Sequence, residues 1–222
     1  MNTSMHPEAG GKWRFPIAFE GIPFIAVASF VTIYLAALGL GLGAWFFLAL
    51  TLFITWFFRD PERVIPEEKG AIVSPADGKI VCVDTVNDAV GLESALKVSI
   101  FMTVFNVHVN RAPTAGTVTD VVYHPGKFFS ANLDKASLDN ERNAVFLDIG
   151  RGRKLVVVQI AGLIARRIVC KTKKGDDLRR GQRFGIIRFG SRVDCYLPLD
   201  AKLGVTVGGK VLAGASILGY LP

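Results

Sequence analysis

The sequence contains little cysteine and little histidine, and each shortage excludes a class of site. Three cysteines occur in 222 residues, at positions Cys82, Cys170 and Cys195. An odd number at these wide spacings forms neither a disulfide framework nor a metal-ligand motif. We therefore predict a reducing compartment, cysteines that pack as small apolar residues, and no bound metal. Three histidines leave few candidates for a general base at neutral pH.

Charge is absent from residues 21–58, a run of 38 residues without Asp, Glu, Lys or Arg. Three alternate glycines within residues 39–43 divide the run, and we predict two apolar helices at 22–38 and 44–58 joined by a tight reversal. Each helix would reach about 22–26 Å, slightly less than the ~30 Å hydrocarbon core of a bilayer. The hairpin would cross a thinned bilayer or enter it without crossing. A helical hairpin buried in a soluble protein is the alternative.

Basic residues flank this apolar run on both sides. Lys12 and Arg14 precede it, and Arg59 and Arg63 follow it. The positive-inside rule then places both ends in the cytoplasm. The run is longer than the apolar part of a secretory signal and lacks a small-residue cleavage site, so we expect it to be retained. We predict a chain held at the cytoplasmic face of the cell membrane.

From residue 71 onward the pattern changes to short apolar runs separated by glycine and proline, which is typical of all-β domains. A short helix is predicted near residues 130–138. The predicted fold is mainly β: a compact β-rich catalytic domain with few short helices at 71–222, preceded by a tail (1–20), the helical hairpin (21–58) and a linker (59–70). The predicted strands cover residues 79–83, 97–105, 116–123, 144–149, 154–160, 167–172, 184–189, 192–197 and 202–207.

The formal net charge of +7 is concentrated in one segment. Residues 151–192 contain thirteen Lys and Arg against only Asp176 and Asp177. Such a patch suits anionic lipid head groups or nucleic acid. Because the apolar run points to a membrane, we predict an anionic membrane surface as the partner and no nucleic acid. A solvated basic face that serves solubility is the alternative.

The pair Gly190-Ser191 lies between two predicted strands, where a turn is the ordinary interpretation. Glycine can adopt backbone angles closed to other residues, so the Gly190 carbonyl can be presented to the neighbouring hydroxyl. If a base removes the hydroxyl proton, Ser191 Oγ can attack this carbonyl carbon and convert the peptide into an ester. β-Elimination would then cut the chain and leave residue 191 as a pyruvoyl group. The pair is a candidate self-cleavage site.

Two further residues are candidates for acid–base chemistry. His108 follows a predicted strand and approaches Pro113, where a strand end can present a side chain to a pocket. A histidine can deprotonate a serine or carry a proton to a carbanion. Asp77 can orient a histidine, as the carboxylate of a Ser-His-Asp triad does. A hydrogen-bonded strand histidine and a turn aspartate are the structural alternatives.

Five segments occur in one order along residues 60–200 and together resemble the phosphatidylserine decarboxylases. The closest resemblance is to the short type of bacteria and archaea, made as a single-chain precursor. Each segment is weak alone, and their specificity is joint. They are Ser74-Pro75-Ala76-Asp77-Gly78-Lys79; His108 with Pro113 and Gly116; Pro125-Gly126 with Phe129, Ser130 and Asn132; Asn140-Glu141-Arg142-Asn143; and Phe189-Gly190-Ser191.

The resemblance implies a proenzyme that cleaves itself between Gly190 and Ser191 into a β chain (1–190) and an α chain (191–222) that stay together. The α chain would begin with a pyruvoyl group made from Ser191, which accepts electrons as carbon dioxide leaves phosphatidylserine. Phosphatidylethanolamine would be the product, and no added cofactor is needed. Asp77 and His108 would support self-cleavage and proton transfer. The expected partners are phosphatidylserine and further copies of the chain in a homo-oligomer.

The chain departs from the family pattern at two positions. Longer members carry a second histidine three residues after the first, which better matches the serine-activating base, and this chain has Arg111 there. His108 would then serve both steps, or Asp77 would activate Ser191 through water, and Arg111 becomes a candidate for binding a substrate carboxylate or phosphate. The usual Gly-Ser-Thr or Gly-Ser-Ser ending is Gly-Ser-Arg, with Arg192, which leaves the nucleophile unchanged.

Two other functions stay open at this point. One is a non-catalytic, membrane-anchored β domain of the lipoyl or hybrid type, in which the Gly190-Ser191 pair is only a turn. The other is a pyruvoyl lyase that acts on a different lipid with a serine head group. Gly214-Ala215-Ser216 is a rival cleavage site, but cleavage there would leave a fragment of only seven residues.

Overall fold

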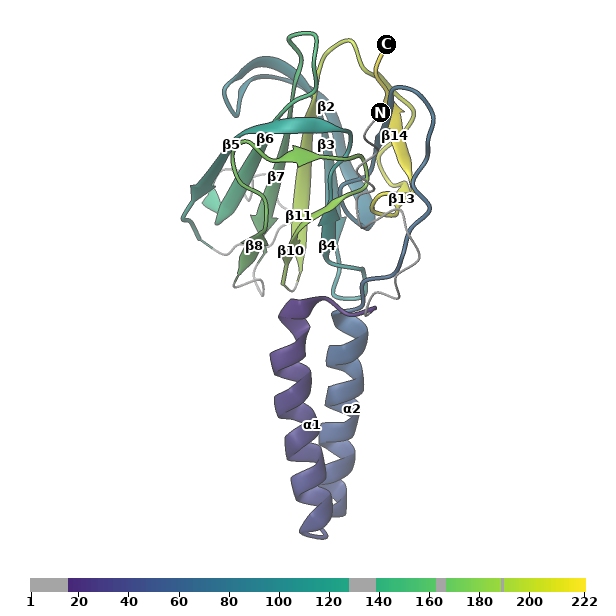
Figure 1. Cartoon of the computed structure of the whole chain (residues 1–222), viewed down its shortest axis with the longest axis vertical. Coiled ribbons are helices and arrows are strands. Elements are labelled where there is room, and N and C mark those ends of the chain that lie inside the picture. Colours follow the sequence, from purple (N-terminus) through teal and green to yellow (C-terminus); the bar gives the residue numbers. More distant parts are fainter. Residues whose placement is uncertain (1–15, 128–138, 163–166, 189) are drawn as a thin grey trace, which may run out of the picture. The chain divides into compact units, whose positions relative to one another are not determined.

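The computed structural model describes residues 16–127, 139–162, 167–188 and 190–222 (Figure 1). It divides into two compact units, one that ends at Glu62 and one that begins at Arg63. The first unit is helical, and the second is built from strands. The predicted fold class, mainly β with an N-terminal helical hairpin, is confirmed.

The helical unit contains a 3-10 turn, η1 (Phe19–Gly21), and two helices, α1 (Ile22–Ala37) and α2 (Gly41–Phe57). Many of its large apolar side chains are exposed, and Leu42 and Trp45 are examples. Phe19–Ala37 forms a helical stretch of 19 residues that is long and apolar enough to cross a membrane, whereas α2 is shorter. By length and composition, the N-terminal apolar helix is suited to contact with lipid.

The reversal between the two helices is tighter than predicted. Within the helical unit only Gly39, with φ of +72°, has the left-handed conformation among the described residues. The second helix begins at Gly41, and Gly43 lies inside it. A Cβ on Gly43 would stand 3.2 Å from Leu35 Cδ1, so this glycine allows the helices to approach closely. The prediction that all of residues 39–43 form the reversal, with a helix starting at residue 44, is wrong.

The described strands of the second unit form three sheets (Figure 1). The large sheet has the order β13-β2-β3-β11-β7-β6-β5-β9, and the small sheets have the orders β4-β10-β8 and β1-β14-β12. The bounds are β1 (Ala71–Val73), β2 (Gly78–Ala89), β3 (Leu92–Met102), β4 (Val109–Arg111), β5 (Gly116–His124), β6 (Arg142–Asp148), β7 (Lys154–Ala161), β8 (Ile168–Cys170), β9 (Asp177–Leu178), β10 (Arg183–Ile187), β11 (Ser191–Leu197), β12 (Lys202–Leu203), β13 (Lys210–Val211) and β14 (Ile217–Tyr220).

Each of the nine predicted runs contains a strand. The sequence missed β1, β4, β9, β13 and β14, which have two to four residues each and are too short to show an alternating pattern. The predicted runs for β2 and β3 also stop short of the hairpin turn between these strands, because the polar residues between 84 and 96 interrupt the apolar pattern. The helix predicted near 130–138 lies outside the described residues.

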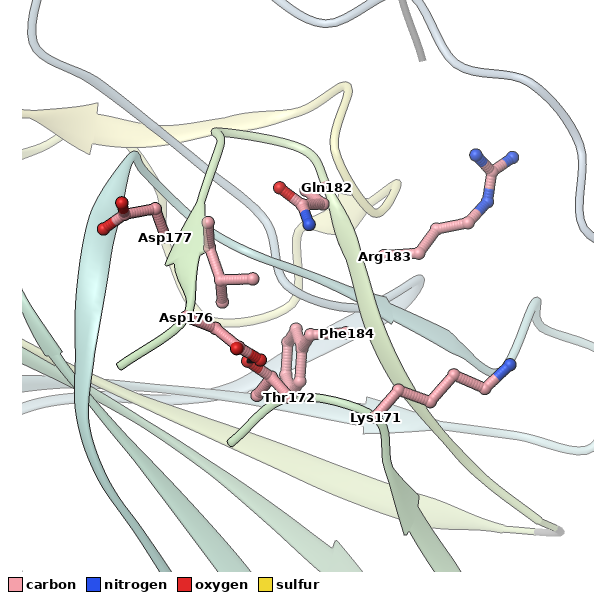
Figure 2. A pocket seen from close by; sticks show the side chains of 8 residues that line it. Lys171, Thr172, Asp176, Asp177, Gln182, Arg183 and Phe184 are labelled. Carbon is pink, nitrogen blue, oxygen red and sulfur yellow. Dashed lines mark hydrogen bonds between the residues drawn. The ribbon is translucent and has the colours of Figure 1, made fainter. Parts of the chain in front are cut away.

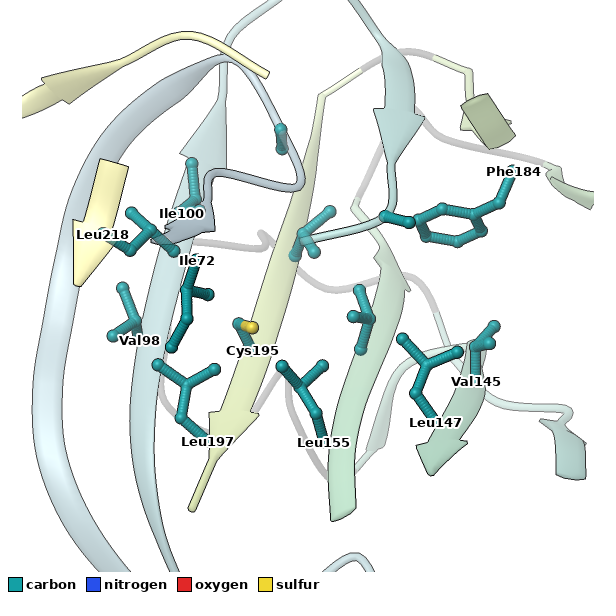
Figure 3. Packing of buried hydrophobic residues seen from close by; sticks show 14 of the residues in the cluster. Ile72, Val98, Ile100, Val145, Leu147, Leu155, Phe184, Cys195, Leu197 and Leu218 are labelled. Carbon is teal, nitrogen blue, oxygen red and sulfur yellow. The ribbon is translucent and has the colours of Figure 1, made fainter. Parts of the chain in front are cut away.

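Strand β11 is the central element of the domain. It pairs antiparallel with β3 on one side and β7 on the other, and all seven of its residues are buried. Val193, Cys195 and Leu197 point into the main core, where Figure 3 shows Cys195 and Leu197 among apolar side chains from several strands. Burial raises the pKa of the Cys195 thiol, so it stays protonated and packs as an apolar residue, as predicted.

The sheet β4-β10-β8 packs against one face of the large sheet (Figure 1). Its strands contact β6 and β7, and the amide of Gln159 on β7 donates a hydrogen bond to Asn110 on β4. The strand β10 leads directly into β11. The chain therefore changes from one sheet to the other between Ile187 and Ser191, and this corner positions the candidate site.

Candidate active site

The predicted cut site lies at the corner between the two sheets. Gly190 has φ of +48°, in the left-handed region that glycine adopts without the steric penalty of a side chain. Apart from its chain neighbours, no atom of the described residues lies within 4 Å of the place where a Cβ would stand. The need for glycine here is therefore one of backbone conformation and not of space.

Ser191 is fully buried, although it is the first residue of its strand. It pairs with Met102 on β3 and with Ala161 on β7, and register partners point to the same face of a sheet. That face carries the main core, to which both partners belong. Within the part of the chain that the structure describes, Ser191 Oγ has no hydrogen-bond partner. Because a buried polar group without a partner costs about 1–3 kcal/mol, this hydroxyl marks a candidate functional position.

Two connections bring His108 to the same corner. Its carbonyl oxygen accepts a hydrogen bond of 3.4 Å from the N–H of Ile187, the last residue of β10. From the other side, a tight turn follows Met102, the partner of Ser191, and leads to His108 within six residues. The topology therefore places His108 beside the segment that contains the predicted cut site.

The ring of His108 has a defined tautomer. Its Nδ1 lies 2.9 Å from the carbonyl oxygen of Asn106, which can only accept a hydrogen bond. Nδ1 therefore carries the proton, and in the neutral ring the lone pair lies on Nε2. The Asn106 side chain in turn accepts hydrogen bonds from the N–H and hydroxyl of Thr103, which hold this turn in place. His108 is buried and has the form of a base at Nε2.

Asp77 is buried at the turn that precedes β2. Its Oδ2 accepts a hydrogen bond of 2.9 Å from the Arg63 guanidinium, and its Oδ1 accepts one of 2.7 Å from the Ala213 N–H. These two contacts tie the start of the domain to a segment near its C-terminus. The orientation of His108 by Asp77 stays a prediction.

Arg111 is buried on β4, where its guanidinium donates a hydrogen bond of 3.0 Å to the carbonyl of Gly181. Side chains alternate along an extended chain, so Arg111 points to the opposite face of β4 from Asn110 and from the preceding His108. A Cβ on Gly214 would stand 2.8 Å from Arg111 Cδ, which places Arg111 near the residues that hold Asp77. Its binding of a substrate anion stays a prediction.

Three buried amide side chains form a row of hydrogen bonds. Asn143 and Gln159 lie on the same face of the large sheet as Ser191, and Asn110 lies on β4. Asn143 Nδ2 donates to Gln159 Oε1 at 3.1 Å, and Gln159 Nε2 donates to Asn110 Oδ1 at 2.9 Å. Gln159 pairs with Val193, two residues after Ser191 on β11, so the row lies on the Ser191 face, one step along the strands. Among the described residues the Nδ2 of Asn110 has no hydrogen-bond partner.

The opposite face of β11 carries a different polar cluster. Arg192 Nε and one of its terminal nitrogens donate to the two carboxylate oxygens of Asp194, at 2.6 and 3.1 Å. The same terminal nitrogen donates to Ser99 Oγ on β3 at 2.9 Å, and Lys97 Nζ lies 3.4 Å from Asp194 Oδ2. Both Arg192 and Asp194 are buried. This cluster ties the first residues after the predicted cut to β3.

A separate cavity of about 180 Å³ lies between β9 and β10 (Figure 2). Its lining includes Asp176, whose Oδ2 accepts hydrogen bonds from the Lys173 N–H and the Thr172 hydroxyl. These bonds, the Lys173 N–H first, lower the pKa of the Asp176 carboxyl. Figure 2 shows the Lys171 and Arg183 side chains extending away from this carboxylate. Because the hydrogen bonds of Asp176 are local, the carboxylate serves to hold the 172–176 turn.

The structure thus brings together Gly190, Ser191 and His108, and it places Asp77 and Arg111 in a neighbouring group. Sequence reasoning missed the amide row. Asn143 lies in one of the segments that resemble the family, and a further signal was the polar residue Gln159 inside the apolar run of β7. The rival serine, Ser216, accepts a hydrogen bond of 2.9 Å from the Leu212 N–H in a turn.

Comparisons with known proteins agree with these observations. The family model for phosphatidylserine decarboxylase matches residues 50–219. Three similar relatives are each named phosphatidylserine decarboxylase proenzyme. That of Ralstonia nicotianae is 57% identical over 99% of both chains, and that of Ralstonia pickettii is 56% identical over 99% of both. That of Geotalea uraniireducens is 52% identical and covers 93% of this chain and 97% of the relative.

These matches extend over nearly the whole length of the relatives and include the helical unit as well as the β-rich one. They overturn the alternative of a non-catalytic lipoyl or hybrid domain, since the matched family consists of enzymes. The chain therefore belongs to the phosphatidylserine decarboxylase family of enzymes.

Proposed function

We propose that the chain cleaves itself between Gly190 and Ser191 and then converts phosphatidylserine into phosphatidylethanolamine and carbon dioxide at a pyruvoyl group derived from Ser191. One observation carries the proposal: the Ser191 hydroxyl is fully buried without a hydrogen-bond partner in the described structure, directly after a glycine in the left-handed conformation. A structural serine in a core strand would normally find a partner. Membership of the family and the word proenzyme in the names of its relatives support the same conclusion.

Self-cleavage follows from the chain's own groups. A base removes the Ser191 hydroxyl proton, Oγ bonds to the Gly190 carbonyl carbon, and the bond from that carbon to the Ser191 nitrogen breaks as the nitrogen takes up a proton. Loss of the Ser191 Cα proton then expels the Gly190 carboxylate from Cβ. Water replaces the nitrogen of the resulting enamine, ammonia leaves, and residue 191 becomes a ketone.

His108 is the candidate base for the first proton transfer. Its tautomer leaves the lone pair on Nε2, and the β3–β4 connection and β10 both bring it to the Ser191 corner. In turnover the same nitrogen can return a proton to the carbon that loses carbon dioxide. Asp77 is the alternative base, which would act through water. It accepts hydrogen bonds from Arg63 and the Ala213 N–H and precedes β2, which lies on the other side of β3 from β11.

The residues around position 191 fit a pyruvoyl group. The side chain lies in an apolar environment that includes Met102 and Ala161, and a ketone needs no more space than the serine it replaces. When formed, the group supplies an electron sink for the pair of electrons left by the departing carboxylate. The chain's part is to keep the group in an apolar environment, since position 191 is fully buried, and to hold His108 at the same corner as a base.

The small chain is retained because its first strand is central. Ser191–Leu197 pairs with β3 along its whole length and with β7 along most of it. Both neighbours belong to the large chain after cleavage. The bond from Arg192 to Ser99 and the contact between Lys97 and Asp194 add side-chain links between the two chains. Separation would expose the main core, so the two chains stay together.

The exposed apolar side chains of the helical unit suit contact with lipid, and we place them at the membrane that contains the substrate. The basic residues on both sides of the hairpin favour the cytoplasmic face.

The proposal is tested by the intact mass of the purified chain before and after addition of hydroxylamine. We expect fragments of 190 and 32 residues, the smaller one blocked to N-terminal sequencing. Hydroxylamine should trap the ester as a hydroxamate on Gly190 and release a small chain that begins with an unmodified serine. The processed chain should release carbon dioxide from phosphatidylserine vesicles. A chain that stays unbroken, or fragments that meet at another peptide bond, would overturn the proposal.

A further inference from the structure

The free donor at the end of the amide row has no role in the chemistry described so far. Asn110 is fully buried, its Oδ1 accepts from Gln159, and its Nδ2 has no partner among the described residues. An amide nitrogen of this kind only donates, so its partner must be a hydrogen-bond acceptor. A buried donor without an acceptor costs about 1–3 kcal/mol, which a structural role would not explain.

The position of Asn110 directs this donor to the Ser191 site. His108 directly precedes β4, and its hydrogen bond from the Ile187 N–H continues the pairing of β10 with β4, so the side chains of His108 and Asn110 leave the same face. That face lies against the large sheet, as the bond to Gln159 shows. Gln159 pairs with Val193, so Asn110 contacts a residue whose register partner is two residues from Ser191 on the same face of the sheet. The same small sheet therefore brings an amide donor and a histidine to the side of the sheet that carries the Ser191 hydroxyl.

The hydrogen bonds of the row hold this donor in one direction. Asn143 donates to Gln159, and Gln159 donates to Asn110, so each amide determines the orientation of the next. Gly185 is opposite Asn110, and a Cβ there would stand 2.8 Å from Gln159 Nε2, so Gly185 leaves room for this contact. The last amide therefore presents its NH2 group at the end of the row.

We propose that Asn110 Nδ2 donates a hydrogen bond to a carboxylate oxygen of the substrate's serine head group; this rests on the proposed function. Among the described residues of the uncut chain the donor meets no acceptor, and in this proposal the acceptor is supplied by the substrate. During turnover the substrate amine meets residue 191. The carboxylate is two bonds from that amine, whereas the phosphate is four bonds away. A donor held beside Gln159, whose register partner Val193 is two residues from Ser191, is therefore placed to bind the carboxylate rather than the phosphate.

The test uses the full chain with Asn110→Asp, which keeps an acceptor for Gln159 and replaces only the donor. Asn87→Asp, the same change at an exposed position of β2, is the matched control. We expect Asn110→Asp to process itself normally and to raise KM for phosphatidylserine vesicles at least about tenfold, since a hydrogen bond to a charged group is lost and replaced by repulsion. The value of kcat should change much less.

Phosphatidylethanolamine, which lacks the carboxylate, supplies a second readout. Its inhibition constant should be the same for the wild-type and Asn110→Asp chains. Asn110→Ser keeps a hydroxyl for Gln159 without the reach of the amide, and it should show the same selective loss if the aspartate chain does not fold. An unchanged KM, an equal loss of affinity for both lipids, or a failure of self-cleavage in a folded variant would overturn this role. A wild-type chain that cleaves itself but does not decarboxylate phosphatidylserine would instead overturn the proposed function.

Discussion

The two faces of strand β11 bury polar groups in opposite ways. On one face, the groups of Arg192 and Asp194 meet one another, and Ser99 and Lys97 complete the cluster. On the other face, one residue earlier, the Ser191 hydroxyl has no partner among the described residues, and the Asn110 amide nearby leaves one donor unused. Both faces are equally buried.

This difference separates structure from chemistry within one strand. Polar groups that satisfy one another stabilise a buried strand and fix its position. Polar groups that stay unsatisfied lower stability, and the fold retains them where a reaction needs them. In the proposed function, the ion cluster therefore anchors the residues that follow the cut, and the opposite face keeps the proposed nucleophile and donor available.

The largest expected effect comes from removing the nucleophile. Ser191→Ala leaves no oxygen to attack the Gly190 carbonyl, so the chain should stay whole and release no carbon dioxide above background. Intact mass and a carbon dioxide assay measure both. Cleavage that persists in this variant would show that another residue, with Ser216 as the first candidate, starts the reaction.

Replacement of His108, the proposed base, should have the next largest effect. His108→Gln keeps a polar side chain but cannot accept the proton, so self-cleavage and turnover should slow by roughly 10²–10⁴-fold. The rates are measured by the time course of intact mass and by carbon dioxide release. His124→Gln, at an exposed position at the end of β5, is the control and should leave both rates unchanged. Normal rates in the His108 variant would assign that residue a structural role.

A substitution in the cluster of Arg192 and Asp194 should lower the stability of the fold. Asp194→Asn leaves the buried Arg192 guanidinium without its countercharge, which should cost about 3–5 kcal/mol of unfolding free energy. The measurement is urea unfolding of the single chain, with Ser191→Ala as the background so that cleavage does not complicate it. A loss of less than about 1 kcal/mol would show that the cluster does not anchor the strand.

The smallest effect is expected at the surface. Arg153 and Asp200 form an ion pair of 3.4 Å in which the Asp200 side chain is 48% exposed. Because water screens such a pair, Asp200→Asn should change the unfolding free energy by about 0–1 kcal/mol in the same assay. A loss as large as that of Asp194→Asn would mean that burial does not explain the difference between the two pairs.

The amino-acid pattern predicted most of the fold. An uncharged run predicted the helical hairpin, and alternation predicted nine of the strands, because burial of one face leaves a periodic signal in the sequence. The shortest strands, such as β4, were not predicted, because two to four residues are too few to show an alternating pattern. The start of the second helix was placed late, because Gly41 and Gly43 were assigned to the reversal that Gly39 makes alone.

The candidate site was predicted less completely. Gly190-Ser191 and His108 were selected by the chemistry of their side chains and by resemblance to a family, and the structure brings them to one corner. Neither ground selected Asn110 or Gln159. An amide becomes informative only when its partners are known, and those partners are distant in sequence.

The sequence by itself therefore determined which elements form and which residue types are available: an apolar hairpin, a β-rich domain, and a glycine followed by a serine between two strands. Only the tertiary structure decided that the serine lies buried in the central strand, with one polar face satisfied and the other not. The physical reason is that hydrogen-bond satisfaction depends on strand order and register, which join β3, β7 and β11 across separations that local patterns do not record.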